Sequence, residues 1–144
     1  MANFPKTAEI RVTARTAAGV WCELTYADPA ATYTLPVKAG QGVRASSFSV
    51  VKTAFDGSPT CKVGDGFDDD GFLDNTDIAL ATAASSTVPA LKLFSASGNP
   101  YANGKVYTSE DTVDFIWDPS TATAGVVRFY VELTSKMEHD GVTP

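Results

Sequence analysis

Apolar and polar side chains alternate near both ends of the chain, which is typical of β-strands with one buried face. Near the N-terminus, Ile10, Val12 and Ala14 alternate with polar residues. A short turn at residues 16–19 follows, and a second alternating run covers residues 20–26. Two such runs joined by a short turn that contains glycine predict an antiparallel hairpin.

The same alternation returns near the C-terminus, in two runs on either side of a polar loop at residues 119–125. The apolar residues are Val113, Phe115 and Trp117 in the first run and Val127, Phe129, Val131 and Leu133 in the second. We expect the two runs to form a second antiparallel hairpin. Because each run has one strongly apolar face, that face must pack against another sheet.

The middle of the chain holds shorter segments that favour β-structure. Residues 33–37 alternate, and Pro36 places this strand at a sheet edge or near its own end. Residues 43–55 are apolar on both faces, so this run is either buried on both sides or carries a β-bulge. Residues 78–89 fit either a short helical turn or a polar connection.

These segments predict an all-β fold, a β-sandwich or jelly roll of about eight to ten short antiparallel strands with little helix. Thr, Val and aromatic residues are frequent, whereas the usual helix-forming residues are scarce. A chain of 144 residues is long enough for one such core. We therefore assign residues 1–7 to an N-terminal arm, 8–135 to a single β-sandwich domain and 136–144 to a C-terminal tail.

The net charge of −6 is distributed unevenly along the chain. Residues 1–55 carry +3, residues 56–77 carry −6 and the remainder carries −3. Because phosphate binding needs a concentrated basic face, nucleic acid is not an expected partner. The uneven charge instead suits contact between unlike protein surfaces. We see neither a signal peptide nor an apolar stretch long enough to cross a bilayer, and therefore expect no membrane partner.

Few residues belong to the types that perform catalysis. The sole histidine, His139, lies in the predicted tail, so no His-based triad or metal cluster can be assembled. Glu110, Asp111 and Asp114 could be read as paired carboxylates, but they stand at the start of a strand, where solvated acids are common. We therefore expect no enzymatic activity and no cofactor other than the calcium considered below.

The two cysteines, Cys22 and Cys61, are far apart in the sequence. A disulfide would form only if the fold brought them together in an oxidising compartment. Neither has a neighbouring base that would activate a thiol nucleophile. We favour two buried thiols in a protein that folds in a reducing cytoplasm.

Residues 52–80 form a stretch rich in Asp and Gly that holds seven of the 17 acidic residues. One interpretation aligns Gly71 with the invariant glycine of a calcium-binding loop. The aspartates that then fall at ligand positions are Asp68, Asp70, Asp74 and Asp77. The first ligand position would be Gly66, which has no side chain, and no amphipathic helices flank the stretch. Turn geometry and solubility are the simpler explanation of the composition, and calcium remains the alternative.

Several segments resemble a pattern that recurs in structural proteins of tailed bacteriophages. These segments are residues 53–57 (TAFDG), 63–66 (VGDG), 71–74 (GFLD), 107–113 (YTSEDTV) and 120–131 (STATAGVVRFYV). Their common order and spacing make the resemblance specific. It covers roughly residues 42–135, whereas the first forty residues carry nothing diagnostic.

The resemblance implies a β-sandwich decoration, or cement, protein of the phage head. Such a protein is not an enzyme; it is made in the host cytoplasm, binds the outer capsid surface of the virion and stabilises the shell. The implied partner is the major capsid protein. A closed homo-oligomer, with a trimer favoured, would match the local symmetry of the shell.

The N-terminal segment is net positive, and its first residues look unpaired, which makes it the candidate for contact with the capsid. The residues that we select are Phe4, Lys6, Arg11 and Arg15. A frayed terminus explains the same segment equally well.

The alternative function is a carbohydrate- or receptor-binding module of a phage fibre or tail, where similar domains also occur. Sugar rings stack on flat, exposed aromatic faces. The aromatic residues that would serve are Trp21, Tyr26, Tyr33, Tyr101 and Tyr107.

Overall fold

The computed structural model describes residues 7–82, 91–94 and 99–134, with only the backbone of residues 91–93. These ranges contain eleven β-strands. The strands are β1 (Thr7–Glu9), β2 (Arg11–Arg15), β3 (Gly19–Thr25), β4 (Ala31–Val37), β5 (Gly42–Val43), β6 (Phe48–Thr53), β7 (Thr60–Gly64), β8 (Leu91–Leu93), β9 (Lys105–Val106), β10 (Asp111–Asp118) and β11 (Val126–Glu132). In the described residues no helix has the length and apolar character needed to span a membrane. The all-β prediction is confirmed.

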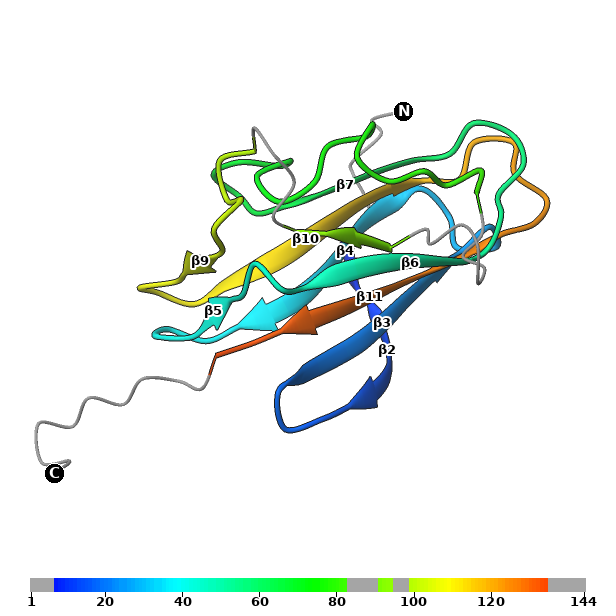
Figure 1. The fold of residues 1–144 in the computed structure, drawn as a ribbon. Coiled ribbons are helices and arrows are strands. Elements are labelled where there is room, and N and C mark those ends of the chain that lie inside the picture. Colours follow the sequence, from blue (N-terminus) through cyan, green and yellow to red (C-terminus); the bar gives the residue numbers. More distant parts are fainter. Residues whose placement is uncertain (1–6, 83–90, 95–98, 135–144) are drawn as a thin grey trace, which may run out of the picture.

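Two facing sheets make the fold a β-sandwich, as predicted (Figure 1). Sheet A has the strand order β1-β4-β10-β7, and sheet B has the order β2-β3-β11-β6-β8. The short strands β5 and β9 pair separately, at the end of the sandwich where β4, β7 and β11 finish. We call this end the β9 end.

The core lies between the central strands of the two sheets, β10 and β11. Alternate side chains of these strands face inward and are at most 2% exposed: Val113, Phe115 and Trp117 from β10 and Val127, Phe129 and Val131 from β11. The rings of Phe115 and Phe129 meet across the core with centroids 4.8 Å apart. The inward faces are those that the alternation predicted.

The predicted C-terminal hairpin, however, is wrong. β10 pairs with β4 and β7 in sheet A, whereas β11 pairs with β3 and β6 in sheet B. Residues 119–125 therefore carry the chain from one sheet to the other. Because β10 and β11 lie in two stacked sheets, their apolar faces bury each other, whereas in a hairpin both apolar faces would point to the same side of one sheet.

The loop between β10 and β11 is held by Asp56. The Asp56 carboxylate accepts hydrogen bonds from the backbone N–H groups of Thr123 at 2.6 Å and Ala124 at 3.1 Å, and from the Thr123 hydroxyl. The loop ends at Gly125, whose φ of 137° is a conformation that favours glycine. A Cβ atom at Gly125 would also strike the ring of Phe55. Residues 55 and 56 thus fix the crossover.

The predicted N-terminal hairpin is confirmed as β2 and β3, with a register shift between Val12 and Ala14. The preceding strand β1 lies in sheet A, where it pairs in parallel with β4. The chain thus passes from one sheet to the other at Ile10, which is 4% exposed. One strand pair is therefore parallel rather than antiparallel, and Thr7, which we assigned to the arm, begins a strand. Residues 1–6 and the predicted tail, 136–144, lie outside the described residues.

The run that we expected over residues 43–55 is divided into β5 and β6 by a turn, with Ser47 N–H bonded to the carbonyl of Arg44. In β6, Ser49 and Val51 are buried, and the pairing with β11 shifts register between Val126 and Val127. A bulge was one of the two explanations offered for this run. Residues 78–82 form turns, and the rest of the ambiguous segment at 78–89 lies outside the described part.

Cys22 of β3 and Cys61 of β7 are free thiols with no exposed surface, which confirms the prediction of two buried thiols. Burial raises the pKa of each thiol to about 12. Both are therefore protonated near neutral pH, and neither supplies a thiolate.

The substitution Phe129→Ala should lower the free energy of unfolding by about 3–5 kcal/mol, because the lost burial and the cavity left behind add. Urea denaturation followed by fluorescence measures this change. Val106→Ala is the matched control: the Val106 side chain is 64% exposed, and a surface change of this kind costs at most about 0.5 kcal/mol. A comparably small loss in Phe129→Ala would contradict a core centred on β10 and β11.

Candidate functional site

The acidic stretch reaches the β9 end at Asp65, directly after β7. The Asp65 side chain has no exposed surface. Its Oδ1 accepts hydrogen bonds from the N–H groups of Phe67 (2.9 Å) and Asp68 (3.0 Å) and from the hydroxyl of Tyr101 (3.1 Å). Its Oδ2 accepts hydrogen bonds from Lys105 Nζ and the hydroxyl of Tyr107, both at 2.9 Å. We call Asp65 and the side chains of Phe67, Tyr101, Lys105 and Tyr107 the Asp65 hub.

The electrostatics of the hub favour a stable ion pair. Burial alone would raise the pKa of Asp65, but hydrogen bonds from Lys105, from the backbone of Asp68 and Phe67 and from Tyr107 hold it below its ordinary value. Burial would lower the pKa of Lys105, and its hydrogen bonds to Tyr101 and Asp65 raise it instead. Burial and the nearby carboxylate raise the pKa of Tyr107. Because a general acid or base works best with a pKa near the operating pH, these groups suit structural support.

Three aromatic rings surround the ammonium group of Lys105. Its Nζ lies 4.2 Å from the ring centroid of Tyr101, 5.1 Å from that of Tyr107 and 5.2 Å from that of Phe67. Cation–π attraction therefore adds to the ion pair with Asp65. The hub ties the loop after β7 to β9 and to the turn before it.

The loop after β7 lies directly on its own strand, and two glycines permit this approach. A Cβ atom at Gly64 would be 2.1 Å from the carbonyl oxygen of Asp68, and one at Gly71 would strike the ring of Tyr101. Backbone bonds from Asp65 N to Asp68 O (2.9 Å) and from Gly71 N to Asp68 O (3.2 Å) close the loop. In this conformation Phe67 points outward and is 86% exposed.

The four calcium candidates fall into two separate groups. Asp68 and Asp70 lie with Asp69, and one carboxylate oxygen of each is within 4.8 Å of the others. In the described residues Asp74 and Asp77 join no such group.

The hydrogen bonds of the four candidates are those of turns. Asp74 Oδ1 accepts the N–H of Thr76 at 2.8 Å, and Asp77 Oδ2 accepts the N–H of Asp74 at 2.9 Å and the side-chain amide of Asn99 at 2.6 Å. Asp68 Oδ1 accepts the N–H of Asp70 at 3.3 Å. A calcium ion held by all four carboxylates would need a different loop conformation from the one observed.

Of the four residues proposed to contact the capsid, Arg11 forms ion pairs within its own chain. Its guanidinium donates to both carboxylate oxygens of Asp28, at 3.2 and 2.9 Å, and lies 3.6 Å from the carboxylate of Glu23. Phe4 and Lys6 lie outside the described residues. Arg15 is exposed and forms no ion pair with any described carboxylate. Of these four candidates, only Arg15 is therefore placed, in the part of the chain described, to offer a free positive charge to a partner.

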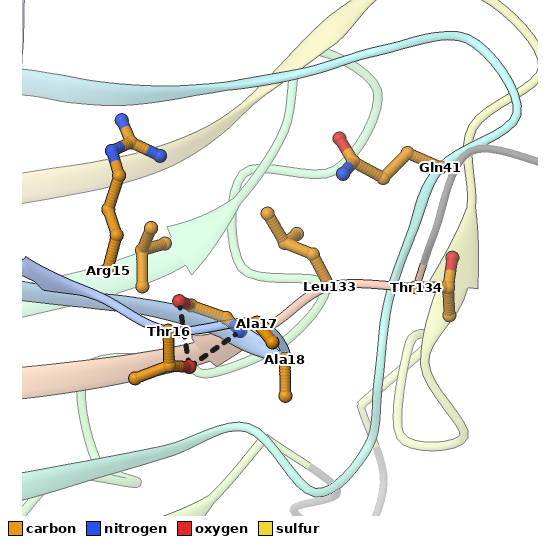
Figure 2. Close-up of a pocket in the computed structure, with 9 residues that line it drawn as sticks. Arg15, Thr16, Ala17, Ala18, Gln41, Leu133 and Thr134 are labelled. Atoms are coloured by element: carbon orange, nitrogen blue, oxygen red, sulfur yellow. Dashed lines mark hydrogen bonds between the residues drawn. The ribbon is translucent and has the colours of Figure 1, made fainter.

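Arg15 stands at the rim of a hollow of about 210 Å³ at the β9 end. Figure 2 shows Arg15 and Gln41 on opposite sides of this hollow, with Leu133 between them. The β2–β3 turn forms one wall, where the hydroxyl of Thr16 accepts the N–H of Gly19 at 3.1 Å. The hydroxyl of Thr134, on another wall, accepts the N–H of Gly42 at 2.7 Å. Hydrogen bonds thus hold both walls in place.

The aromatic residues predicted to be exposed are mostly covered. Tyr33 and Tyr107 are buried, at 8% and 3% exposure, so the expectation is wrong for these two. Trp21 and Tyr101 are half-buried, and only Tyr26, at 44%, is exposed. Tyr33 faces the core because it alternates with the polar residues of β4. Tyr107 turns inward to reach Asp65.

Trp21 belongs to an aromatic row on the outer face of sheet B. Its ring packs against Phe48 and Tyr130, with centroids 5.6 and 5.1 Å away and interplanar angles of 81° and 48°. The three rings are tilted against one another, so the row does not form one flat platform of the kind on which a sugar ring stacks.

The residues that sequence reasoning missed are Asp65 as a buried acid, Phe67 as an exposed aromatic and Lys105 as the partner of Asp65. Asp65 lies in the Asp- and Gly-rich stretch, but no local pattern links it to Lys105, forty positions away. Comparison of the chain with protein-family models, curated protein sequences and solved structures finds no match.

Asp65→Asn preserves the side-chain shape, removes the negative charge and leaves Lys105 without its carboxylate. Breaking a buried ion pair in this way costs about 3–5 kcal/mol, and because Lys105 is partly exposed we expect a loss of about 3 kcal/mol in the free energy of unfolding. Chemical denaturation measures it. Asp69→Asn is the control, since Asp69 is 56% exposed in its pair with Lys62 and such pairs contribute less than about 1 kcal/mol. Equally small losses in both variants would argue against the hub.

The contribution of Asp65 to the free energy of unfolding should disappear in acid. Its folded-state pKa is lowered, whereas an unfolded aspartate titrates near about pH 3.9. Above about pH 4 the stabilisation is fully present. As the pH falls further, the aspartate of the unfolded state takes up its proton first, and the stabilisation is lost as the pH falls through the folded-state pKa. Thermal unfolding between about pH 7 and about pH 3 should therefore show the wild type and Asp65→Asn converging.

Asp114 serves as the control for this titration, because its pKa is raised in the folded state and its effect on stability should have the opposite sign. Burial raises its pKa above the ordinary value; the hydrogen bond from Thr112 acts in the opposite direction, and the nearby Asp111 and Asp65 add to the increase. A carboxylate with a raised folded pKa destabilises the protein at neutral pH and ceases to do so in acid. Asp114→Asn should therefore raise the melting temperature at neutral pH, and this gain should vanish in acid. A difference in melting temperature between the wild type and either variant that stays constant over the pH range would contradict the assigned direction of that pKa shift.

Proposed function

We propose that this chain is a non-enzymatic structural protein of a tailed-bacteriophage particle, which binds the outer surface of the capsid and stabilises it as a decoration protein. The proposal rests on the segments that resemble phage structural proteins. These segments are separate in the sequence, and they meet in space at two junctions.

The first junction is the Asp65 hub. Asp65, from the VGDG segment, accepts the hydroxyl proton of Tyr107, from the YTSEDTV segment, at 2.9 Å. The glycines of the VGDG and GFLD segments, Gly64 and Gly71, lie where a Cβ atom would collide with Asp68 and Tyr101. The residues that make the pattern specific are thus the ones that this contact requires.

The second junction joins the TAFDG segment to the STATAGVVRFYV segment. Asp56 accepts the N–H groups of Thr123 and Ala124, and Phe55 packs where Gly125 leaves room for its ring. This junction sets the crossover between the two sheets. The segments that carry the resemblance therefore contact one another in the fold, and this is the observation that supports the proposal.

The surface chemistry of the β9 end suits binding. Asp65 and Lys105 already satisfy each other within the chain, and the two described thiols are buried, so none of these groups is free to contact a partner. Phe67, by contrast, is exposed on a loop whose backbone is bonded to Asp65, and Arg15 is exposed at the end of β2, beside a turn that the Thr16 hydroxyl holds. Preorganised side chains of this kind reduce the entropic cost of association.

The proposed partner is the major capsid protein, and the proposed location is the outer face of the virion. A shell displays many identical sites, so a closed oligomer that engages several of them binds strongly through individually modest contacts. A homotrimer is the favoured state, because capsid subunits surround local threefold points.

Co-sedimentation of the purified chain with expanded empty shells of the phage that encodes it tests the proposal. We expect saturable binding, regular surface density in electron micrographs and a higher temperature for shell disruption. Empty shells before expansion serve as the comparison, and a glycan array tests the fibre or tail alternative. Glycan binding without shell binding would overturn the decoration role.

A further inference from the structure

Phe67 has the properties of an interface anchor. Three large hydrophobic side chains are exposed in the described part of the chain, and Phe67, at 86%, is more exposed than Val106 at 64% and Tyr26 at 44%. Its backbone N–H is bonded to the buried carboxylate of Asp65 at 2.9 Å, so the loop that presents it is fixed before binding. Preorganised aromatic side chains that enter a pocket on a partner supply much of the energy of protein interfaces.

Three carboxylates follow this anchor directly and define the partner that it suits. Asp68, Asp69 and Asp70 lie close together, and of the three only Asp69 has a basic partner among the described salt bridges, Lys62 at 3.0 Å. A surface that receives Phe67 must therefore offer a partly apolar socket with a positive charge at its rim.

The hollow beside Arg15 meets these requirements. Its lining includes Val20, Leu133 and the alanines of the β2–β3 turn, and Arg15 stands at its rim without an ion pair to any described residue (Figure 2). Its volume is about 210 Å³. A cavity of about 150 Å³ accommodates benzene, so this hollow has room for the ring of a phenylalanine.

The anchor and the hollow lie on opposite margins of the same end of the molecule. Phe67 follows β7, which is an edge strand of sheet A. The hollow adjoins the turn between β2 and β3, and β2 is the edge strand of sheet B on the opposite side of the sandwich (Figure 1). We propose that Phe67 of one copy inserts into the Arg15 hollow of a second copy, with Asp68–Asp70 facing that arginine.

Such a contact joins unlike surfaces, so each copy keeps one anchor and one hollow for further neighbours. A head-to-tail contact of this kind closes into a ring when the rotation between copies permits it. The proposal assigns Arg15 to contact between copies and not to the capsid. A closed ring of such contacts would supply the homotrimer proposed above, but the contact itself does not require binding to a shell and is tested on the purified chain alone.

Sedimentation velocity of the full chain over a range of concentrations tests the contact. The wild type should self-associate at low salt and less at high salt, because the acidic residues and Arg15 are exposed. Phe67→Ala should weaken association roughly thirtyfold through lost burial of the ring. Arg15→Glu should weaken it by repelling the acidic residues. Tyr26→Ala, at the opposite end, removes another exposed aromatic ring and should associate like the wild type.

A mixture of the two defective variants distinguishes this contact from a symmetric one. Phe67→Ala retains the hollow and Arg15→Glu retains the anchor, so an equimolar mixture should form dimers through the one remaining contact. A symmetric contact between two Phe67 loops would not be restored by mixing. Thermal unfolding verifies that each variant is folded, and Arg15→Gln replaces Arg15→Glu should the latter be destabilised.

Three outcomes would overturn the proposal: a wild type that stays monomeric up to about 1 mM, a Phe67→Ala variant that associates like the wild type, or a mixture without dimers. None of them bears on the co-sedimentation experiment. A chain that self-associates but does not bind shells would instead refute the decoration role and leave the contact standing.

Discussion

The burial of β10 and β11 against each other is the constraint on which the rest of the structure depends. Each is a central strand of its sheet, so the neighbouring strands are arranged around one pair of apolar faces. The chain must cross from one sheet to the other between them, and Asp56, Phe55 and Gly125 are placed to make that crossing. The same arrangement brings the ends of β4, β7 and β11 together at the β9 end, where both the hub and the hollow lie.

A buried charge organises that end. Taking a carboxylate out of water is costly unless it is paired and fully hydrogen-bonded. Asp65 meets this condition with partners from its own loop, from the turn at Tyr101 and from β9 and the residue after it. Satisfying the carboxylate holds the loop against β7 and leaves Phe67 outside. An interaction that stabilises the fold therefore also positions the side chain best suited to contact a partner.

Local pattern predicted strands reliably where one face is buried. The alternation of residues 113–117 and 127–133 identified β10 and β11 and their inward faces, since a strand's side chains point to opposite sides in turn. It did not identify their partners, because the same faces are compatible with a hairpin or with stacked sheets. The calcium spacing failed to bring its four aspartates together for a related reason: Asp74 and Asp77 are used by hydrogen bonds of the next turn. Nor did Arg11 remain free, because the fold places Asp28 beside it.

The sequence by itself determined the all-β class and the inward faces of the main strands, and it favoured two buried thiols over a disulfide. All of these depend on residue type and on neighbours in the chain. Only the tertiary structure decided that β10 and β11 lie in different sheets, that Asp65 pairs with Lys105 and that Phe67 is exposed while Tyr107 is buried. These outcomes depend on which distant segments share the core, and their physical basis is the need to satisfy a buried carboxylate and to cover two apolar faces at once.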